Sequence, residues 1–444
     1  MKLVIAGAVA AGMSTASKLK RLDPSINITV YEKGKDVSYG ACGMPYYVSG
    51  EIEDDQSLVA RTAEEFRKKG IVLHLKHEVT YIDPLNKEIM VHGLENDTKF
   101  SAIYDKLLIA TGANAIRLPI EGSELSGIHT LGTLEDGRGL HSILRDDSVQ
   151  KVAVIGAGYI GVEISESLRK LGKEVVLVEQ EPHVLPKFSP LIAEVVEDNL
   201  RENGVTIHLE ERLEKYGGDS HVEKLYTDQG IYDVDLVIEA IGVKPATKFL
   251  DKSGIKRLNN GAVKVNDKLE TNIKDIYAAG DCAAYPHKLT GKLAYIPLGT
   301  HANKAGRIIA ERLSGMDSHF HGVIGSSVLK AFELEIARTG LTLSEAEAFN
   351  SDTVSIRALD RAGYYPGATP VDILVIYDVE TCKILGVEMV GEQGVAHRIN
   401  VAASAISSGL TAHEVSQLDL AYAPPFSPVW DPLQTACNQI KCRK

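Results

Sequence analysis

Two stretches of the chain repeat one pattern of apolar and polar positions. In each stretch an apolar run enters a glycine-rich turn, a segment of helical periodicity follows, and a second apolar run ends at an acid, Glu32 or Glu179. The predicted helices and second strands are 13–22 with 26–31, and 162–171 with 174–178. An acid about twenty residues past the last glycine is typical of a dinucleotide-binding βαβ unit. One such pattern is weak, but two in one chain predict two nucleotide-binding domains.

The first glycine turn departs from the usual spacing. Gly7 and Gly12 occupy the first and last glycine positions, whereas Val9 stands at the middle one. The turn can still form, although its backbone would approach a pyrophosphate less closely. An ordinary packing site between strand and helix is the alternative. Because Glu32 and Asp281 both fit dinucleotide use, we expect Glu32 to accept hydrogen bonds from an adenosine ribose.

The second glycine turn is complete, with Gly156, Gly158 and Gly161 at the three positions. Glu179 ends the following strand, and no arginine adjoins it. A carboxylate there pairs with a ribose 2′-hydroxyl and repels a 2′-phosphate, which predicts a preference for NADH over NADPH. Tyr159 lies inside the turn. It either covers a flavin face when nicotinamide is absent or packs as an ordinary aromatic side chain.

Other apolar runs fit the same architecture. Segments 104–113 and 235–242 each end in a glycine turn and indicate points where the chain crosses between nucleotide domains. Segment 271–281 ends in Gly-Asp, which allows Asp281 to bind the ribityl chain of a flavin. From about residue 323 strands precede helices, which predicts a separate α+β domain. Its predicted strands and helices are 326–336, 371–378, 384–390, 394–408 and 412–417.

Composition narrows the class of protein. The 444 residues are enough for about three domains. A net charge of −12 argues against nucleic-acid binding and against anionic membranes, since both need a positive field. No apolar run of about twenty residues occurs, so no membrane span is expected. The five cysteines are scattered, which predicts neither a disulfide framework nor a metal site and favours a reducing cytoplasm.

Cys42 is the cysteine that carries chemical information. It follows a loop downstream of the first glycine turn and opens a segment that predicts a helix, where the N-terminal dipole favours a thiolate. The next cysteine in sequence is Cys282, which we expect to be buried. A single cysteine at this place indicates chemistry with an external sulfur partner, carried as a mixed disulfide or persulfide. Cys437 and Cys442 are expected to be free thiols in a frayed terminus.

Taken together, these motifs resemble the two-dinucleotide flavoprotein disulfide reductases. Two shorter sequences, Cys-Gly-Met-Pro-Tyr-Tyr at 42–47 and Ala-Tyr-Ala-Pro-Pro at 421–425, are similar to coenzyme A-disulfide reductases and NADH-dependent persulfide reductases. The resemblance spans essentially the whole chain. It implies an α/β fold with two Rossmann-like domains and a C-terminal α+β dimerisation domain. The expected boundaries are 1–113 with 247–322 for FAD, 114–246 for NAD(H) and 323–444 for dimerisation.

The resemblance also implies a mechanism. NADH would reduce FAD, and the electrons would pass to sulfur at Cys42. The family's tyrosines that face the cysteine of the partner subunit match Tyr364 and Tyr422, whose hydroxyls would protonate the leaving thiolate. Each complete site would then need a homodimer. Packing at the rim of the dimer contact is the alternative role for both tyrosines.

Coenzyme A carries phosphates, and the resemblance places its contacts at Arg21, Ser38 and Lys69, with Arg61 nearby. Without the resemblance, these cations read as a solvated helix face. Coenzyme A is therefore expected as a substrate or as a bound adduct. The family often has Asn before the cysteine, but here the residue is Ala41, which leaves room for persulfide substrates.

Further residues are expected at the cofactor sites because they match the family's positions. For FAD they are Ala10, Ala11, Lys33, Val79, Thr111, Gly112, Leu298, His301 and Ala302. For the nicotinamide cofactor they are Ile160, Glu163 and Gly242.

Two competing functions remain open. NADH oxidases and peroxidases share the architecture and cycle one cysteine, here Cys42, through a sulfenic acid. The peroxidases have a histidine in the first glycine turn, and this chain has none there. A non-catalytic flavoprotein that senses NADH would not need Cys42, Tyr364 and Tyr422 together. Their joint presence favours an enzyme.

Overall fold

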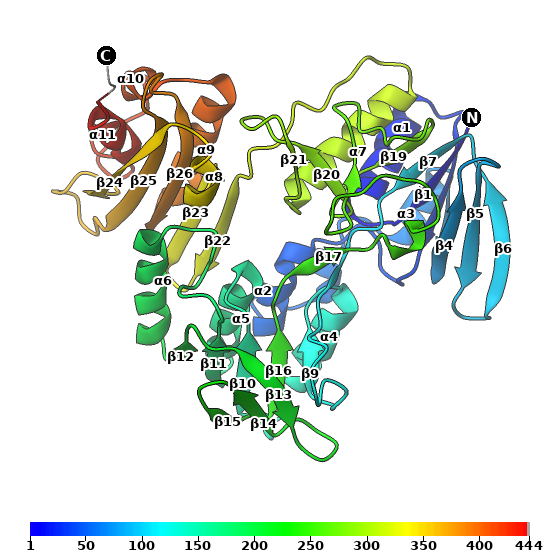
Figure 1. The fold of residues 1–444 in the computed structure, drawn as a ribbon, viewed down its shortest axis with the longest axis horizontal. Helices are drawn as coiled ribbons and strands as arrows, with labels where there is room; N and C mark the ends of the chain where they lie inside the picture. Colours follow the sequence, from blue (N-terminus) through cyan, green and yellow to red (C-terminus); the bar gives the residue numbers. More distant parts are fainter. Residues whose placement is uncertain (442–444) are drawn as a thin grey trace. The chain divides into compact units, whose positions relative to one another are not determined.

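The computed structural model describes residues 1–441 and divides into two compact units. The first unit contains three segments, Met1–Ile116, Gly132–His141 and Val243–Val323. The second contains Arg117–Leu131, Ser142–Gly242 and the chain from Ile324 onward. Figure 1 shows the chain coloured along its length. The three-domain boundaries expected from the sequence remain a prediction.

A parallel sheet of five strands forms the centre of the first unit. Its order is β19 (Ile276–Ala278), β7 (Lys106–Ile109), β1 (Lys2–Ala6), β2 (Asn27–Glu32) and β3 (Ile71–Leu75). The inner strands are fully buried because both faces of a parallel sheet are covered, so they read as apolar runs. This is the nucleotide-binding sheet predicted for the first unit.

Two helices pack against each other in the first unit, α1 (Ala10–Leu22) and α7 (Gly299–Leu313). A Cβ on Gly306 of α7 would lie 2.4 Å from the carbonyl oxygen of Ala11 in α1, so only glycine permits this approach. Figure 1 shows α7 beside α1. The first turns of the two helices contain Ala11 and Ala302, and both of these residues are buried.

The second unit contains another parallel sheet of five strands. Its order is β12 (Val205–His208), β11 (Glu174–Val178), β10 (Lys151–Ile155), β16 (Leu236–Glu239) and β9 (Ile128–Thr130). Helix α5 (Tyr159–Lys170) connects β10 to β11, as predicted for the second βαβ unit. Helix α6 (Pro190–Glu202) then leads to β12.

The C-terminal part of the second unit is an antiparallel sheet. Its order is β22 (Ser327–Ala331), β23 (Leu334–Gly340), β26 (Ile384–Gly391), β25 (Pro370–Asp378) and β24 (Ser351–Leu359). The single strand predicted over 326–336 is wrong. The chain turns at Phe332, which has a φ of +51°, and returns as β23. Helix α9 (Val395–Ser408) packs on β23 and β26, and helices α10 (Ala412–Ser416) and α11 (Pro432–Asn438) follow.

Smaller elements complete the two units. The first unit has the sheets β4 (His77–Asp83), β5 (Glu88–Gly93), β6 (Thr98–Ile103); β8 (Ala113–Ala115), β17 (Val243–Pro245); and β18 (Val263–Lys264), β20 (Ala283–Pro286), β21 (Leu293–Ala294). The second has β13 (Leu213–Gly217), β14 (Lys224–Thr227) and β15 (Ile231–Asp233). The short helices are α2 (Met44–Ser49), α3 (Ala63–Lys68), α4 (Leu134–Ile143), α8 (Leu343–Ala346), and the 3₁₀ turns η1 (Ala41–Gly43), η2 (Asp55–Leu58), η3 (Lys248–Leu250).

Two of the cysteines expected from the sequence to be buried or frayed are both buried in the structure. Cys282 is fully buried, as predicted. Cys437 is not in a frayed terminus, because it lies buried on α11, where apolar packing raises the pKa of its thiol to about 12. Cys442 lies outside the described residues. Among residues 1–441, no helix combines the length and apolar character needed to cross a bilayer.

Candidate active site

The first glycine turn is held by the acid that ends β2. Gly7 has a φ of +107°, and a Cβ there would lie 2.1 Å from the carbonyl oxygen of Ala110. A Cβ on Gly12 would lie 2.0 Å from the carbonyl oxygen of Gly7. The Glu32 carboxylate accepts hydrogen bonds from the N–H of Ala8 at 2.7 Å and of Gly34 at 2.8 Å. Glycine is therefore required at both ends of this turn.

The first turns of α1 and α7 and the end of β19 converge in the first unit. A Cβ placed on Gly280, whose φ is +87°, would lie 3.3 Å from the Cβ of Ala11 and 3.8 Å from that of Ala302. Asp281 follows Gly280 directly, and burial raises the pKa of its carboxyl. Leu298, at the N-cap of α7, offers no side-chain cap.

A buried hydroxyl near Asp281 has no hydrogen-bond partner among the described residues. It belongs to Tyr295, whose pKa is raised first by burial and then by the Asp281 charge. His301 is largely buried and contacts the carbonyl oxygen of Ile296 through Nδ1 at 3.1 Å. Burial lowers the pKa of His301, so its imidazole is neutral near pH 7.

The remaining residues expected at the FAD site lie in the first unit. Lys33 donates to Asn114 Oδ1 at 3.0 Å, and Val79 is buried in β4 beside a bulge. The Thr111 hydroxyl donates to the carbonyl oxygen of Ala246 at 2.9 Å. Gly112 has a φ of +66° with open space around it. These contacts tie the 111–112 turn to the strand that returns the chain from the second unit.

Cys42 lies exposed in the 3₁₀ turn η1, immediately ahead of the six-residue helix α2. The helix expected to open at Cys42 is therefore a 3₁₀ turn that continues as an α-helix. The N–H of Ser38, a residue with a φ of +50°, donates to the carbonyl oxygen of Ala8 at 2.9 Å. This bond joins the Cys42 loop to the first glycine turn.

The cations of α1 and of residues 61–69 differ in their partners. Lys18 pairs with Glu311, Lys68 pairs with Glu64, and Arg67 donates to a backbone carbonyl. No acid among residues 1–441 lies within ion-pair distance of Arg21, Arg61 or Lys69.

These three cations are on segments that meet. A Cβ on Gly70, next to Lys69, would lie 3.7 Å from the Lys20 ammonium, next to Arg21. The N–H of Ala60, next to Arg61, donates to the carbonyl oxygen of Ser38 at 2.9 Å. The structure thus brings the segment of Lys69 to that of Arg21, and the segment of Arg61 to that of Ser38, four positions before Cys42.

The second glycine turn repeats the construction of the first. A Cβ on Gly161 would lie 1.9 Å from the carbonyl oxygen of Gly156, whose φ is +96°. Open space surrounds Gly158, the N-cap of α5, so a ligand backbone can approach it. The Glu179 carboxylate accepts from the N–H of Ala157 at 2.7 Å and of Glu181 at 3.0 Å.

Tyr159 begins α5, followed by Ile160, and is held by side chains of the same unit. Its hydroxyl lies 2.8 Å from Ser327 Oγ, and its ring meets Phe188 edge to face with centroids 6.0 Å apart. Glu163 lies one turn further along α5 and is half-buried. Gly242 has a φ of +106° with open space around it.

Tyr364 and Tyr422 meet in the C-terminal part of the second unit. Their hydroxyl oxygens lie 3.0 Å apart, and both rings are exposed, by 76% and 45%. The bond from Tyr364 raises the pKa of the Tyr422 hydroxyl. Other large apolar side chains exposed in the segments next to them in sequence are Tyr365, Phe426, Val429 and Trp430.

The residues present fit the dinucleotides that the sequence predicts. In each glycine turn a Cβ would clash with backbone atoms, so glycine keeps the turn tight. A buried acid at the end of the second strand hydrogen-bonds the backbone of each turn. The orphaned Tyr295 hydroxyl and the half-buried Asp281 carboxyl fit the polar groups of a flavin nucleotide. Among residues 1–441 no cluster of three metal-ligating side chains occurs.

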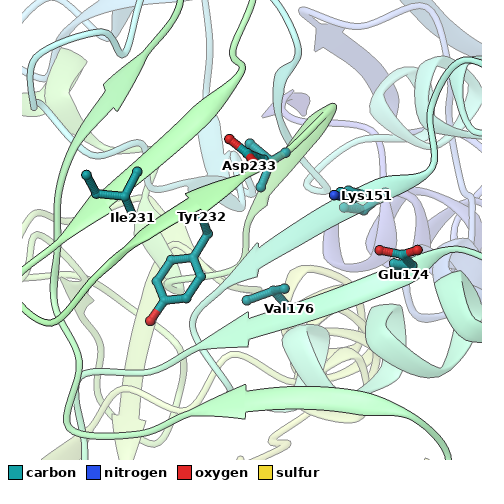
Figure 2. A pocket seen from close by; sticks show the side chains of 8 residues that line it. Lys151, Glu174, Val176, Ile231, Tyr232 and Asp233 are labelled. Atoms are coloured by element: carbon teal, nitrogen blue, oxygen red, sulfur yellow. The ribbon is translucent and has the colours of Figure 1, made fainter.

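A shallow pocket lies away from all these residues. Figure 2 shows it at the amino ends of β10 and β11, where Lys151 and Glu174 stand on neighbouring strands. Ligands of doubly wound sheets bind at the carboxyl ends of the strands. None of the predicted site residues lines this pocket.

The fold and the site together define a class of protein. The family model described as pyridine nucleotide-disulphide oxidoreductase matches residues 1–306, and its dimerisation domain matches 327–433. The chain belongs to this family. It is a flavoprotein NAD(P)H-dependent oxidoreductase, as the sequence predicted, and its dimerisation domain indicates a homodimer.

Similar proteins narrow the group. The chain is 38% identical to the NAD(P)H sulfur oxidoreductase (CoA-dependent) of Pyrococcus furiosus, covering 99% of both chains. It is 36% identical to the NADH oxidase of Methanocaldococcus jannaschii, covering 99% of this chain and 98% of the relative. A NAD-dependent persulfide reductase from A. fulgidus has a similar structure, with a TM-score of 0.95, 36% identity, and coverage of 99% and 83% of the two chains.

The sequence reasoning missed one group of residues beside Cys42. Helix α4 was not predicted, and its Arg138 bonds Asp36 and Asp55 on either side of the Cys42 loop. No local spacing signals such a contact, because Arg138 is 83 and 102 positions away from its partners.

Proposed function

We propose that this enzyme uses NADH to reduce coenzyme A disulfide, coenzyme A persulfide or a related polysulfide through Cys42. The observation that carries the proposal is the exposed position of Cys42 in a 3₁₀ turn whose loop is bonded to the first glycine turn. No second cysteine lies near it in sequence to form an internal pair. The names of the Pyrococcus furiosus and A. fulgidus relatives support sulfur as the acceptor.

The proposed chemistry begins with disulfide exchange at Cys42. Its thiolate attacks one sulfur of the substrate disulfide, so a mixed disulfide forms while the second sulfur leaves as a thiolate. When bound, FAD supplies the transfer of two electrons from NADH. Those two electrons and one proton split the mixed disulfide into a thiol and the Cys42 thiolate. A persulfide would instead transfer its outer sulfur to Cys42, and the same reduction would release sulfide.

Tyr364 and Tyr422 would serve Cys42 of the partner subunit. The 3.0 Å bond between their hydroxyls raises the pKa of Tyr422 and keeps its proton on oxygen at neutral pH. A protonated hydroxyl at the leaving sulfur would act as the general acid for thiolate departure. Because both side chains are exposed, they are accessible to a second copy of the chain.

Arg21, Arg61 and Lys69 would bind the phosphates of coenzyme A. No acid within residues 1–441 lies within ion-pair distance of any of the three, whereas Lys18 and Lys68 form ion pairs. Ser38 would contribute its hydroxyl beside the loop. Phosphate contacts of this kind are strong because donor and acceptor are both charged.

The cofactor residues are proposed at the two glycine turns. FAD would be held by residues 1–113 and 247–322, with Glu32 on a ribose and Asp281 on the ribityl chain. NADH would be held by 114–246, with Glu179 on its ribose. Residues 323–444 would form the dimer contact.

The test is the intact mass of the purified holoenzyme, denatured without reductant. We expect a coenzyme A adduct that reductant removes and that Cys42→Ser lacks, together with loss of NADH turnover on coenzyme A disulfide in that variant. Cys282→Ser is the matched control, since Cys282 is buried. Full turnover on disulfides in Cys42→Ser would exclude the proposal.

A second function is favoured by one observation, the similarity to the NADH oxidase of Methanocaldococcus jannaschii. Exposed Cys42 is accessible to peroxide and would then cycle through a sulfenic acid. Oxygen consumption with NADH alone separates the two functions. A rate equal to that with coenzyme A disulfide would favour the oxidase.

A further inference from the structure

Helix α4 is bonded to the loop that carries Cys42. The loop is closed by backbone pairing. Tyr39 and Val59 form an antiparallel bridge, and the N–H of Gly40 donates to the carbonyl oxygen of Leu58 at 2.8 Å. Two carboxylates stand next to this closure, Asp36 before it and Asp55 at the start of η2. Both face the guanidinium of Arg138.

Arg138 binds both carboxylates at once. It donates through Nη1 and Nη2 to Asp36 at 2.6 and 2.9 Å, and through Nε to Asp55 at 2.5 Å. The three side chains are only 25%, 18% and 19% exposed, so solvent screens these pairs incompletely. Burial raises the pKa of Asp55, but its bonds to Arg138 outweigh burial and lower the pKa overall. The Asp55 carboxylate is therefore charged at neutral pH.

Three further contacts of α4 reach the same loop. The Tyr39 hydroxyl lies close enough to the Leu134 backbone for that backbone to lower its pKa, but burial raises the pKa of Tyr39 to about 12 overall. The rings of Tyr47 and His141 stack with centroids 4.3 Å apart and planes 9° apart. Gly137 faces Met44, because a Cβ there would lie 3.7 Å from the Met44 Cγ. The helix therefore contacts the loop on both sides of η1.

We infer that Arg138 is a positioning residue, which holds the Cys42 loop in the geometry needed for sulfur exchange. The inference rests on the proposed role of Cys42. A planar guanidinium with three bonds to two carboxylates fixes both distance and orientation, which one ammonium group cannot do. Residues 132–141, which include Arg138 and most of α4, belong to the first unit, whereas the chain on both sides of them belongs to the second.

The test compares two reactions of the holoenzyme in Arg138→Gln. Reduction of coenzyme A disulfide needs Cys42, whereas NADH-dependent reduction of a dye does not. We expect kcat for the disulfide to fall ~10-fold or more, because small displacements of a reacting group are costly. Dye reduction should change little. Amide hydrogen exchange in residues 36–60 should become faster, and exchange elsewhere should stay unchanged.

Arg257→Gln is the matched control. Arg257 lies in the same unit, is 23% exposed, and donates to Asp251 and to a backbone carbonyl. It should leave the disulfide reaction and the exchange of 36–60 unaltered. If Arg138→Gln does not fold, Asp55→Asn serves instead, because it alters only the contact made by Arg138 Nε. Asp55→Asn should lower kcat for the disulfide less than Arg138→Gln does. Arg138→Lys should keep more of the disulfide rate than Arg138→Gln.

Two results would overturn the inference. One is an equal fall of disulfide and dye turnover with faster exchange throughout, which would make Arg138 a general stabilising residue. The other is unchanged exchange in 36–60 with unchanged disulfide turnover. Failure of the proposed function has a separate signature, since Cys42→Ser would then keep its disulfide turnover whatever Arg138→Gln does.

Discussion

The hydroxyl oxygens of Tyr364 and Tyr422 lie 3.0 Å apart, although 58 positions separate the residues along the chain. The bond ties two exposed loops to each other, and the N–H of Ala362 also donates to the carbonyl oxygen of Pro424 at 3.3 Å. An exposed pair of phenols gains little stability from such a bond. The proposed role in proton transfer would give the contact between the two hydroxyls a function.

Tyr422→Phe is therefore expected to lower kcat for coenzyme A disulfide about a hundredfold, because a positioned general acid contributes on that order. Steady-state kinetics with NADH in excess would measure the change. Tyr365→Phe is the control, since it removes a hydroxyl from the same exposed loop. Equal rates in wild type and Tyr422→Phe would remove the tyrosine from the mechanism.

The pH profile tests the same bond in another way. Tyr364 raises the pKa of Tyr422 above its ordinary value of about 10. The wild-type rate should therefore begin to fall only above pH 10, where the Tyr422 hydroxyl loses its proton. Tyr364→Phe removes the bond, so the alkaline limb should move to lower pH. A limb that moves upward or stays in place would show that the tyrosines are not coupled in catalysis.

The unpaired cations near Cys42 predict how substrate size affects binding. Replacing both Arg21 and Lys69 by Gln should raise KM for coenzyme A disulfide by ~10-fold or more, because hydrogen bonds between charged groups are lost. KM for a small uncharged disulfide should not change. Lys68→Gln is the control, because Lys68 already pairs with Glu64. An equal rise in KM for both substrates would show that these cations do not bind coenzyme A phosphates and form only a solvated surface.

The Glu179 carboxylate predicts the choice of nicotinamide cofactor. Wild type should prefer NADH, and Glu179→Gln should narrow the ratio of kcat/KM for NADH over NADPH by about tenfold, the worth of one charged hydrogen bond. The ratio is the proper measure because Glu179 also supports the turn through Ala157. Glu174→Gln, at the exposed start of β11, should leave the ratio alone. Comparable use of both cofactors by wild type would refute the assignment.

The turn at Gly7 predicts a large effect on folding. Gly7→Ala would place a Cβ 2.1 Å from the Ala110 carbonyl at a φ of +107°. We expect a loss of about 3 kcal/mol or more in the free energy of unfolding, measured in urea, with reduced flavin content. Gly139→Ala in α4 meets no atom within 4 Å and should stabilise by roughly 0.5–1 kcal/mol. Equal stability of the two variants would contradict the packing described.

The parts of the fold that the sequence predicts are those with local signals. The turns at Gly7 and Gly156 and the acids Glu32 and Glu179 follow one spacing, so both βαβ units could be predicted and are confirmed. The turn at Phe332 could not be predicted, because no glycine, proline or asparagine marks it. Strand β24, an edge strand whose residues alternate in exposure, was also missed.

In the candidate site, too, some residues have a local sequence signal and others do not. Cys42 and its loop are visible as a motif, whereas Arg138 is invisible because its partners lie on segments far away in sequence. The orphaned Tyr295 hydroxyl also needs the structure, since burial and lack of a partner are properties of packing. Chemistry carried by neighbouring residues can be predicted from a sequence. Chemistry that depends on long-range contacts requires coordinates.

The last prediction concerns Glu388, which is buried at the centre of the C-terminal sheet in β26. It is 1% exposed and accepts a hydrogen bond from the N–H of Ser189 at 2.7 Å, while its second oxygen has no partner among residues 1–441. Burial raises the pKa of this carboxyl above its ordinary value, despite the bond from Ser189 and the charge of Arg338.

A raised pKa fixes the sign of the pH dependence. Below the unfolded pKa of about 4.3, Glu388 is protonated in both states and contributes nothing. As pH rises further, the unfolded chain loses the proton first, so Glu388 increasingly destabilises the fold until pH passes its native pKa. Glu388→Gln imitates the protonated form. Its Tm should exceed that of wild type at pH 8, and the gap should shrink at pH 5. Exposed Glu347→Gln should show no such trend, and a gap that widens toward acid would mean that Glu388 is stabilised as a charge.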